Sequence, residues 1–579
     1  MLESIRTLWP YMRRYRWGLV RGMGSLVIKD VAGAAVPLLI GGAIDALTAG
    51  NRLGVVFRFA LLLVGVSLIK GLFQFWMRVI LIGISRDIEY DLRNDLFANL
   101  VSLSPDFYAR QRTGDIMARA TNDLNAVRMM LGPGIMYWTE TSLTFILAIL
   151  VMMIKDWRLA ILAILPAPLV SVAVMLFGRA IHERFEAIQA MFSDISSRVQ
   201  ENLSGVRMIR AFVQEAPEMR RFEELNKKYI SQNLRLVRIS GIFQPLLEGL
   251  IGITFLVVLW AGGYQVMRHR ISLGGFVMFN TYMGMLVWPM IALGWVVNLM
   301  QRGSASMARI NQIMRERPTI AAPVSPVAVG EVHGAIGFSN VSVDYPSGRA
   351  LDGVELEIPA GSTVAIVGHT GCGKSTLAAL IPRLMDPTEG AVYLDGTDLR
   401  ELDPAQLRRN IGFVPQETFL FSATVGENIA FGVDDATEEQ IREAAELAGL
   451  SADIESFPHR YQTMVGERGI TLSGGQKQRT AIARALLRNP RILILDDALS
   501  SVDTLTEEKI LTGLGGVMRG RTVILISHRV STVRQTDRIV VLEKGCIVEQ
   551  GTHAELVAAG GYYADLSQKQ MLEEELEAI

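Results

Sequence analysis

Gly368-His369-Thr370-Gly371-Cys372-Gly373-Lys374-Ser375-Thr376 matches, from Gly368 to Ser375, the full pattern of a phosphate-binding loop. The apolar run before it, 362–367, predicts a buried strand, and the residues after it predict a helix. The glycines allow a tight turn, so that backbone N–H groups and the helix N-terminus point at the phosphates. Lys374 is expected to reach the β- and γ-phosphates and Ser375 to bind magnesium. The stretch therefore predicts a nucleotide-binding α/β domain.

Two later stretches separate this chain from other proteins that have a phosphate loop. Leu472-Ser473-Gly474-Gly475-Gln476 precedes a helix and predicts a second helix N-terminus able to bind an anion. The apolar run 492–495 ends in Asp496-Asp497, as a buried strand that delivers carboxylates to a metal and phosphate centre should. In this order, the stretches resemble the ATP-binding cassette of an ABC transporter subunit.

The resemblance assigns roles to further residues. Tyr345 matches the aromatic residue on which adenine stacks, although a Tyr beside a Pro is also common in turns. Gln416 matches the glutamine that contacts magnesium and the attacking water, and His528 matches the switch histidine at the γ-phosphate. The implied site comprises, for ATP, Tyr345 and residues 368–376; for Mg²⁺, Ser375, Gln416 and Asp496; and for catalysis, Asp497, His528 and Gln416.

The resemblance also implies a dimer. In the family, residues corresponding to 472–476 cannot fold back onto their own phosphate loop and cover the loop of a partner, so that two ATP molecules join two cassettes head to tail. Ser500-Ser501-Val502-Asp503 matches the loop that crosses to the opposite subunit. Because this chain carries one membrane part and one cassette, it resembles a half-transporter that needs a second half-transporter subunit.

Length and composition limit the class of protein to which the chain can belong. At 579 residues it is too long for one domain, and its mean hydropathy of +0.29 is high for a soluble protein. The net charge of −1 gives no general attraction to nucleic acid. The two cysteines, Cys372 and Cys546, both fall in the expected cytosolic cassette, so no disulfide framework is expected.

Hydropathy changes sharply near residue 320. Stretches 159–178, 250–267 and 271–300 contain no Asp, Glu, Lys or Arg, and each approaches or exceeds the roughly 18 to 20 residues that span a bilayer. Six membrane spans are expected, at about 19–47, 59–82, 131–154, 157–180, 245–267 and 271–300. The expected organisation is a transmembrane domain, 1–317; a proline-punctuated linker, 318–331; and a cassette, 332–579.

Basic residues predict the orientation of the spans. Arg6, Arg13, Arg14 and Arg16 precede the first span, and the long connections are also rich in basic residues, whereas 155–158 and 268–270 are very short turns. We therefore expect a multi-pass protein of the cytoplasmic (inner) membrane whose N-terminus, long connections and cassette face the cytosol. The opening sequence does not resemble a cleavable signal peptide, so the first span is expected to target the membrane.

The two long connections, about 84–130 and 179–241, keep a helical spacing of apolar residues. The spacing is seen at Ile88, Leu92, Leu96, Leu100 and Leu103, and again at Ile195, Val199 and Leu203. This layout resembles the exporter type of ABC transporter, with coupling segments at 112–116 and near 205–215. The predicted fold is a six-helix transmembrane domain with long cytosolic helical extensions, fused to an α/β P-loop ATP-binding cassette.

One residue departs from the family pattern. Most active cassettes place Glu after the strand-end Asp, where it polarises the attacking water, but this chain has Asp497. A general base shortened by one methylene is withdrawn, and misplacement of about 1 Å can cost about 100-fold in rate. In the family, such a replacement recurs in one member of heterodimers, whose paired sites divide into a degenerate and a competent one. A homodimer that works with Asp is the alternative.

The sequence indicates ATP-driven export but leaves the cargo open. The alternatives are a homodimeric lipid or peptide exporter and a nucleotide-gated channel or regulator; six spans exclude a membrane-free cassette ATPase. Side chains of the last three spans suggest a hydrophobic or amphiphilic, drug- or lipid-like substrate: Trp260, Met278, Phe279, Met283, Met285, Trp288 and Trp295. Glu140 and the Lys29-Asp30 pair are polar candidates for a cargo pathway; the alternative is that Lys29 and Asp30 pair with each other or lie at the cytosolic margin. Cys372 is expected to be covered by bound phosphate and accessible without it; the alternative is a sterically inert thiol.

Overall fold

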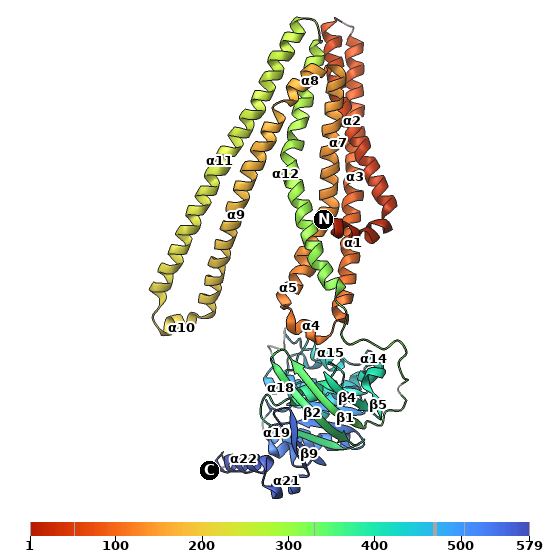
Figure 1. Cartoon of the computed structure of the whole chain (residues 1–579), viewed down its shortest axis with the longest axis vertical. Helices are drawn as coiled ribbons and strands as arrows, with labels where there is room; N and C mark the ends of the chain where they lie inside the picture. Colours follow the sequence, from red (N-terminus) through yellow and green to blue (C-terminus); the bar gives the residue numbers. More distant parts are fainter. Residues whose placement is uncertain (1, 51–52, 329, 467–471, 503, 578–579) are drawn as a thin grey trace. The chain divides into compact units, whose positions relative to one another are not determined.

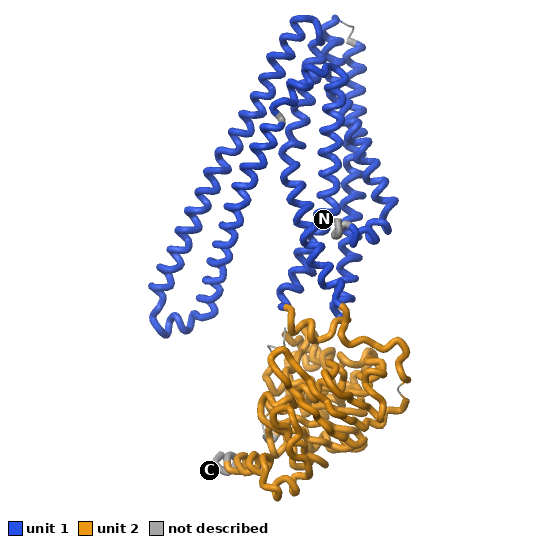
Figure 2. The backbone as a smooth tube through the Cα atoms, in the orientation of Figure 1, with its two compact units in different colours: residues 1–101, 112–316 blue, residues 102–111, 317–579 orange. Residues whose placement is uncertain are grey.

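The computed structural model describes residues 2–50, 53–328, 330–466, 472–502 and 504–577. The chain divides into two compact units (Figure 2). The first comprises Met1–Val101 and Arg112–Glu316, and the second comprises Ser102–Gln111 and Arg317–Ile579. The first is built from helices alone, and the second contains all the strands of the described chain.

Six helical segments of the first unit are long and apolar enough to cross a membrane, as predicted. A short helix, α1 (Leu2–Arg14), precedes them. The helices that carry the six segments are α2 (Arg16–Thr48), α3 (Leu53–Ser102), α7 (Ile135–Lys155), α8 (Trp157–Ile164) with α9 (Ala167–Ser204), α11 (Glu215–Met267) and α12 (Leu273–Arg315).

The fourth span is not continuous. The expected stretch 157–180 is interrupted by a short turn between α8 and α9, with Pro166 in the turn and Pro168 in the first turn of α9. Proline lacks the backbone N–H that would continue the helical hydrogen bonds, and its ring crowds the preceding turn.

The third span enters the membrane domain through two irregular turns. The segment before α7 consists of α5 (Thr113–Ala118), a π-helical turn (Arg119–Asp123), α6 (Leu124–Met129) and a second π-helical turn (Met130–Gly134). Arg309 of α12 binds the carboxylate of Asp123 through Nε at 2.8 Å and through a second guanidinium nitrogen. This ion pair joins the first π turn to the last membrane helix.

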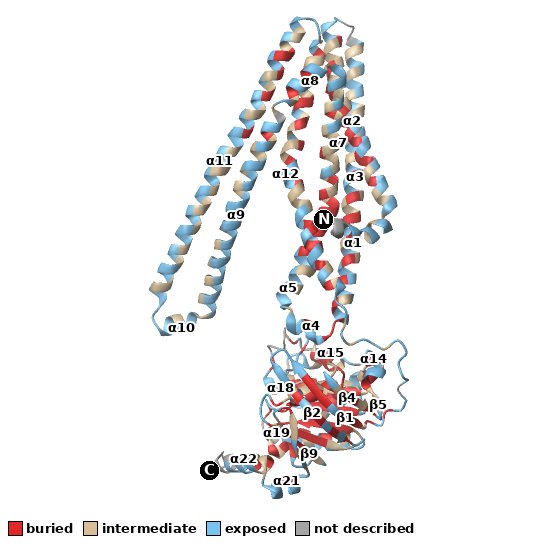
Figure 3. Cartoon of the chain, viewed as in Figure 1, coloured by how far each residue is buried: buried red, intermediate tan, exposed pale blue. Residues whose placement is uncertain are grey.

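The apolar stripe expected on the first long connection is buried. Ile88, Leu92, Leu96, Leu100 and Leu103 are all buried. On the second connection, by contrast, Val199 and Leu203 are exposed. There α9 and α11 run side by side and are joined by α10 (Val206–Ala211), and most of their cytosolic surface is exposed (Figures 1 and 3). This chain alone therefore buries the apolar stripe of the first connection and leaves most of that of the second exposed.

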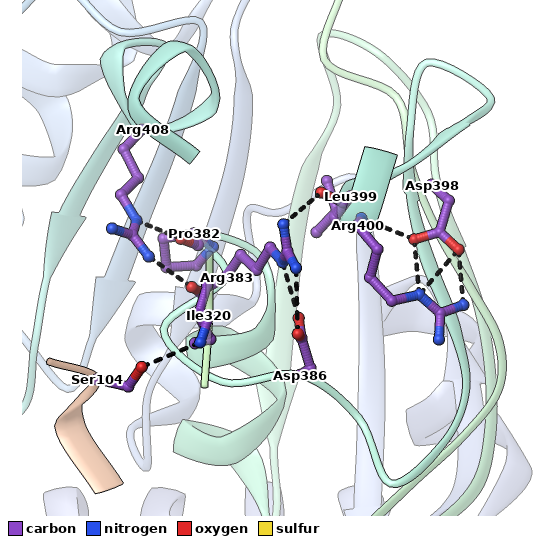
Figure 4. A network of polar contacts seen from close by, with 9 residues as sticks. All are labelled: Ser104, Ile320, Pro382, Arg383, Asp386, Asp398, Leu399, Arg400 and Arg408. Atoms are coloured by element: carbon purple, nitrogen blue, oxygen red, sulfur yellow. Dashed lines mark hydrogen bonds and ion pairs between the residues drawn. The ribbon is translucent and has the colours of Figure 1, made fainter. Parts of the chain in front are cut away.

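The segment that groups with the cassette is not the one that the resemblance indicated. The short helix α4 (Pro105–Arg110), within Ser102–Gln111, belongs to the second unit, whereas 112–116 belongs to the first and begins α5. Pro105 occupies the first turn of α4, where proline is well tolerated. The backbone N–H of Ile320 donates to Ser104 Oγ at 3.1 Å (Figure 4). The cassette unit therefore includes the residues just before 112–116, and the assignment of 112–116 as the first coupling segment stays a prediction.

The cassette contains a six-stranded sheet in the order β10-β9-β3-β8-β7-β6. Its strands are β3 (Thr363–Val367), β6 (Ile411–Val414), β7 (Ile492–Asp496), β8 (Thr522–Ile526), β9 (Arg538–Glu543) and β10 (Cys546–Gly551). All neighbours pair in parallel except β9 and β10. Alternate residues of each strand face opposite sides, so that Val364 and Ile366 enter one core and Ala365 and Val367 enter the other.

A second, antiparallel sheet covers one face of the first through a shared core. Its order is β2-β1-β4-β5, with β1 (Ile336–Tyr345), β2 (Gly348–Ile358), β4 (Glu389–Leu394) and β5 (Thr397–Asp398). The other core is closed by helices that include α15 (Val425–Ala430), α16 (Glu438–Leu447), α18 (Gly474–Leu487), α19 (Thr504–Met518) and α22 (Tyr562–Glu577). Figure 3 shows this buried interior.

The remaining elements of the described cassette are short, and all but α21, which follows the last strand, lie between strands in the sequence. They are α13 (Lys374–Leu380), the 3₁₀ turn Leu399–Glu401, α14 (Pro404–Arg409), α17 (Ser451–Ser456), the 3₁₀ turn Arg460–Gln462, α20 (Val530–Val533) and α21 (His553–Ala559).

A polar network holds the loop after α13. Arg383, buried and with a φ of 51°, pairs with Asp386 through Nε at 2.8 Å. Arg408 of α14 donates to the carbonyls of Pro382 and Arg383 at 2.9 and 2.6 Å (Figure 4). The backbone N–H of Val327 also donates to the carbonyl of Glu401 at 2.9 Å. Part of the expected linker is therefore attached to the cassette.

Candidate nucleotide-binding and catalytic site

The phosphate loop joins the carboxyl end of β3 to α13. Gly368, Gly371 and Gly373 have φ values of +153°, +83° and +106°. A Cβ at Gly373 would lie 2.6 Å from the carbonyl oxygen of Ala350, so glycine is required there for space as well as for conformation. Thr370 and Gly371 are exposed and line a cavity of about 420 Å³.

Lys374 lies along this loop. Its side chain is buried, and Nζ donates to the carbonyls of Gly368 and His369 at 2.9 and 2.8 Å. These bonds place a positive charge against the loop, next to the exposed backbone of the cavity. A charge in this position favours an anionic ligand.

Two residues of the loop face away from the cavity. His369 makes an edge contact with the ring of Tyr562 on α22, with centroids 4.9 Å apart. Cys372 is only 6% exposed and packs in the core shared with the antiparallel sheet. The expectation of an accessible Cys372 thiol is therefore wrong: the residue between two loop glycines points inward and fills apolar space.

The carboxyl ends of β7 and β8 bring the acidic and imidazole groups to the same cavity. Because these parallel strands are neighbours, Asp496 and Asp497 lie beside the residues that follow Ile526. Ser375 Oγ donates to Asp496 Oδ1 at 3.1 Å. His528 Nε2 lies 3.3 Å from Asp497 Oδ2. Asp497 has a left-handed φ of 49°, and its N–H donates to the carbonyl of Ile526 at 3.0 Å.

Burial changes the acidity of one of these groups. Burial raises the pKa of Asp496 above its usual value, and the adjacent Asp497 raises it further. The hydrogen bond from Ser375 and the charge of Lys374 act in the opposite direction, but they do not outweigh burial. A cation bound next to Asp496 would favour its ionised form.

Two more predicted residues line the same cavity. Gln416 follows β6 and is exposed. Tyr345 ends β1, and its hydroxyl lies 3.5 Å from Thr376 Oγ1. The cavity therefore gathers the predicted residues Tyr345, Thr370, Gly371, Gly373, Lys374, Ser375, Thr376, Gln416, Asp496, Asp497 and His528.

The sequence analysis missed the turn between β1 and β2. Ser347, Gly348, Arg349 and Ala350 also line the cavity. Arg349 pairs with Asp344 at 2.9 Å and with Asp352 at 2.7 Å, and the bond to Asp344 is the main reason that its pKa is raised. The spacing of Asp344, Arg349 and Asp352, on either side of a Pro-Ser turn, was the available signal.

Residues 472–476 do not line this cavity in the described part of the cassette. Ser473 caps α18 in a reciprocal capping box: the N–H of Gln476 donates to Ser473 Oγ at 3.3 Å, and the N–H of Ser473 donates to Gln476 Oε1 at 3.0 Å. Gln476 Nε2 also donates to Asp453 at 2.9 Å. The helix N-terminus is exposed at Ser473 and Gly474.

Gln478 is a second residue that sequence reasoning missed. It is buried, its Nε2 donates to Ser500 Oγ at 3.0 Å, and its Oε1 accepts the N–H of Ser501 at 2.9 Å. A Cβ at Gly475 would lie 3.1 Å from the carbonyl oxygen of Ser501, so the chain approaches α18 closely here. The start of α18 and the loop after Asp497 thus pack directly against each other. Asp503, named above, lies outside the described residues.

Side chains of α19 and α22 hold the loop that carries His528. Arg529 and Thr532 both donate to the buried carboxylate of Glu507 on α19. Gln570 of α22 donates through Nε2 to the carbonyl of His528 at 2.6 Å, and its Oε1 accepts the N–H of Val530 at 2.7 Å. The C-terminal helix α22 therefore supports the position of His528. No local sequence motif predicts this support.

Comparisons with known proteins agree with this architecture. The family model for the ABC transporter transmembrane region matches residues 19–290, and the ABC transporter model matches 351–500. A Bacillus subtilis protein named "Probable multidrug resistance ABC transporter ATP-binding/permease protein" is 40% identical over 99% of this chain and 98% of its own. The ATP-dependent lipid A-core flippase of Syntrophus aciditrophicus is 37% identical over 95% of this chain and 92% of its own.

A solved structure of a bacterial Atm1-family ABC exporter with ATP bound has a TM-score of 0.80 and 29% identity, and the match covers 96% of this chain and 98% of that one. The fold and the cavity define an ATPase coupled to membrane transport. This chain belongs to the ABC transporter family, as an ATP-driven exporter of the multi-pass inner-membrane type with a cytosolic cassette.

Proposed function

We propose that this chain is one half of a dimeric exporter that moves a hydrophobic or amphiphilic, drug- or lipid-like solute, and that its own ATP site is degenerate. The proposal that the ATP site is degenerate rests on the presence of Asp at position 497. Its carboxylate is one methylene shorter than the family's glutamate, and it contacts His528 at 3.3 Å. A carboxylate held by the switch histidine is poorly placed to polarise an attacking water.

The proposed roles of the cavity residues follow from their chemistry. Residues 368–376 bind the phosphates, and Tyr345 stacks on adenine. Ser375 and Asp496 present oxygen atoms 3.1 Å apart, and Gln416 lines the same cavity. Magnesium prefers oxygen ligands and takes only a few from a protein when phosphates supply others, so this donor set fits it. Bound Mg²⁺ would neutralise charge on the β- and γ-phosphates.

The proposed partner is a homologous, non-identical half-transporter. The exposed N-terminus of α18, with residues 472–476, would complete the partner's ATP site and not its own. At α10 and just after it, Val206, Met208, Phe212 and Val213 are exposed apolar side chains on a cytosolic hairpin. Such a group suits a surface that a second subunit covers. We propose the limits 1–317, 318–331 and 332–579 for the membrane domain, the linker and the cassette.

Fewer side chains support the proposed solute class than the sequence suggested. Met278, Phe279 and Met283 are buried within the chain and serve packing. Trp260, Trp288 and Trp295 are exposed and are free to meet lipid or solute. Among the relatives, one name refers to multidrug resistance and another to a lipid A-core flippase, and these names support a drug- or lipid-like solute.

Transport by proteoliposomes tests the proposal. The chain is reconstituted alone and with its candidate partner, and ATP-dependent accumulation of an amphiphilic dye is measured with hydrolysis in the same sample. We expect accumulation against a gradient only when both subunits are present. Equal transport by the chain alone supports the homodimer instead, and movement that only equilibrates the dye supports a gated channel.

A further inference from the structure

Three charged side chains meet inside the membrane domain. Lys29 and Asp30 lie on α2, and Glu140 lies on α7. Lys29 Nζ is 2.8 Å from Asp30 Oδ1 and 2.5 Å from Glu140 Oε1. One ammonium group is therefore shared by two carboxylates, and the cluster is one positive charge short of neutrality when all three groups are ionised.

One oxygen of the cluster has no partner. Asp30 is 5% exposed, and its Oδ2 is buried without a hydrogen bond from any described residue. Thr144 Oγ1 reaches only the other oxygen, Oδ1, at 3.5 Å. An unpaired carboxylate oxygen in an apolar region is unfavourable, and such groups in membrane domains commonly mark pathways for polar ligands. A positively charged or hydrogen-bond-donating ligand would therefore stabilise Asp30 Oδ2.

The neighbouring helix does not supply that ligand. Lys70 of α3 is half-buried, and its Nζ approaches Gly33, one turn beyond Asp30 on α2, at 3.9 Å from the position of a Cβ there. No hydrogen bond or ion pair joins Lys70 to Asp30 among the described residues. Lys70 therefore makes no direct contact that satisfies Asp30 Oδ2.

The cluster is most exposed at Glu140, which lies one helical turn from an aromatic pair. The side chain of Glu140 is 27% exposed, whereas those of Lys29 and Asp30 are 3% exposed. Tyr137 lies one helical turn before Glu140, and its ring meets that of Trp295 on α12 edge to face, with centroids 5.3 Å apart. Trp295 is about half exposed. A carboxylate next to aromatic rings is the combination that recognises organic cations.

We propose that Asp30 and Glu140, with the Tyr137–Trp295 pair, bind the positive charge of an amphiphilic cation that the exporter carries. The inference rests on the proposed function and names the charge of its solute. Lys29 neutralises one carboxylate and leaves the other for the ligand, so that the site attracts a monovalent cation and rejects an anion of the same shape.

Two ions of nearly equal shape test this site. Tetraphenylphosphonium and tetraphenylborate carry opposite charges, and their equilibrium binding is measured on the purified full-length exporter, with its partner, in nanodiscs. We expect the cation to bind more tightly. Glu140→Gln should weaken cation binding by about tenfold, as loss of one nearby charge in a partly buried site predicts, and should leave the binding of the anion unchanged or stronger. Asp30→Asn should act in the same direction.

A matched carboxylate provides the control. Glu248 on α11 is exposed and accepts a hydrogen bond only from Gln244, at 3.2 Å, in the described chain. Glu248→Gln should leave the affinity for the cation unchanged. Because Asp30 is buried and its variant can fail to fold, Glu140→Gln carries the test, and each variant is first checked by size-exclusion chromatography. Equal affinity for both ions, binding of neither, or equal losses in Glu140→Gln and Glu248→Gln would overturn the proposal.

ATP-driven uptake into inside-out vesicles separates this inference from the proposed function. The two ions and a neutral fluorescent lipid analogue are compared. If ATP moves none of the three, the exporter proposal fails and the inference falls with it. If ATP moves them without preference for the cation, only the cation site fails. Preferential uptake of the cation, reduced in Glu140→Gln and not in Glu248→Gln, supports both.

Discussion

His528 Nε2 lies 3.3 Å from Asp497 Oδ2, so the carboxylate that follows β7 and the imidazole that follows β8 form one pair at the nucleotide cavity. Gln478 holds the chain on one side of this pair, and Gln570 holds it on the other. Because the two strands are parallel neighbours, residues about 30 positions apart in the sequence meet at one edge. The pair is the part of the site on which the proposed asymmetry depends.

The first prediction concerns the two ATP sites of the assembled exporter. If Asp497 belongs to a degenerate site, Asp497→Asn should leave most of the ATPase activity, because the main base belongs to the partner. Ser473→Arg should nearly abolish turnover, since a bulky side chain at the N-terminus of α18 would block the partner's site. Hydrolysis rates of both variants are measured with the partner present. A severe loss from Asp497→Asn would sink the degenerate-site hypothesis and favour the homodimer.

The second prediction concerns nucleotide affinity. Lys374→Ala should weaken ATP binding at this chain's own site by about tenfold or more, because it removes a charge-assisted contact with the phosphates. Fluorescent ATP-analogue titration of the purified exporter measures the change. Lys544→Ala is the control, because Lys544 is on the cassette surface and its side chain is 90% exposed. Unchanged affinity in Lys374→Ala would contradict the assignment of the loop.

The third prediction concerns Gln478. Gln478→Leu removes the bonds to Ser500 and Ser501 and leaves a backbone N–H without its partner. We expect the free energy of unfolding of the cassette to fall by about 1–3 kcal/mol and ATPase activity to fall with it, while ATP affinity stays near wild type. Gln406→Leu on exposed α14 is the matched control. A stability loss of equal size in both variants would show that Gln478 has no special role.

The fourth prediction concerns the two cysteines. Cys372 is buried, so maleimide should label it slowly in the native protein, with or without ATP, and rapidly only after unfolding. Cys546 is partly exposed and should react first. Mass spectrometry of labelled peptides distinguishes the two. Rapid labelling of Cys372 that ATP suppresses would show instead that its thiol faces the phosphates.

The fifth prediction concerns Asp496. Its pKa is raised in the folded protein, so ionisation of this carboxyl disfavours folding at pH above that pKa, and the penalty shrinks as the pH falls below the folded pKa and is gone below the unfolded pKa. Asp496→Asn should therefore raise the melting temperature of the nucleotide-free protein at neutral pH and have less effect in acid. The same variant should lose the added stabilisation that Mg²⁺ with ATP gives. Thermal unfolding across pH, with and without Mg²⁺ and ATP, measures both effects.

Local sequence was sufficient for the elements that carry strong patterns. The glycines and Lys374 predicted the phosphate loop because few backbone conformations permit it, and long apolar stretches predicted six spans because a bilayer demands them. The period of the stripe from Ile88 to Leu103 predicted a helix on the first connection, and the structure buries its apolar face. Each of these signals lies within one short segment.

Tertiary structure decided what depends on residues far apart in the chain. The inward direction of Cys372, the support of His528 by Gln570, the clamp at Gln478 and the sharing of Lys29 by Asp30 and Glu140 all join separate elements. Sequence could name Glu140 and Lys29 as polar groups in the membrane, but not that they touch. Patterns of spacing report which face of an element is apolar, whereas packing alone selects the neighbour that each face meets.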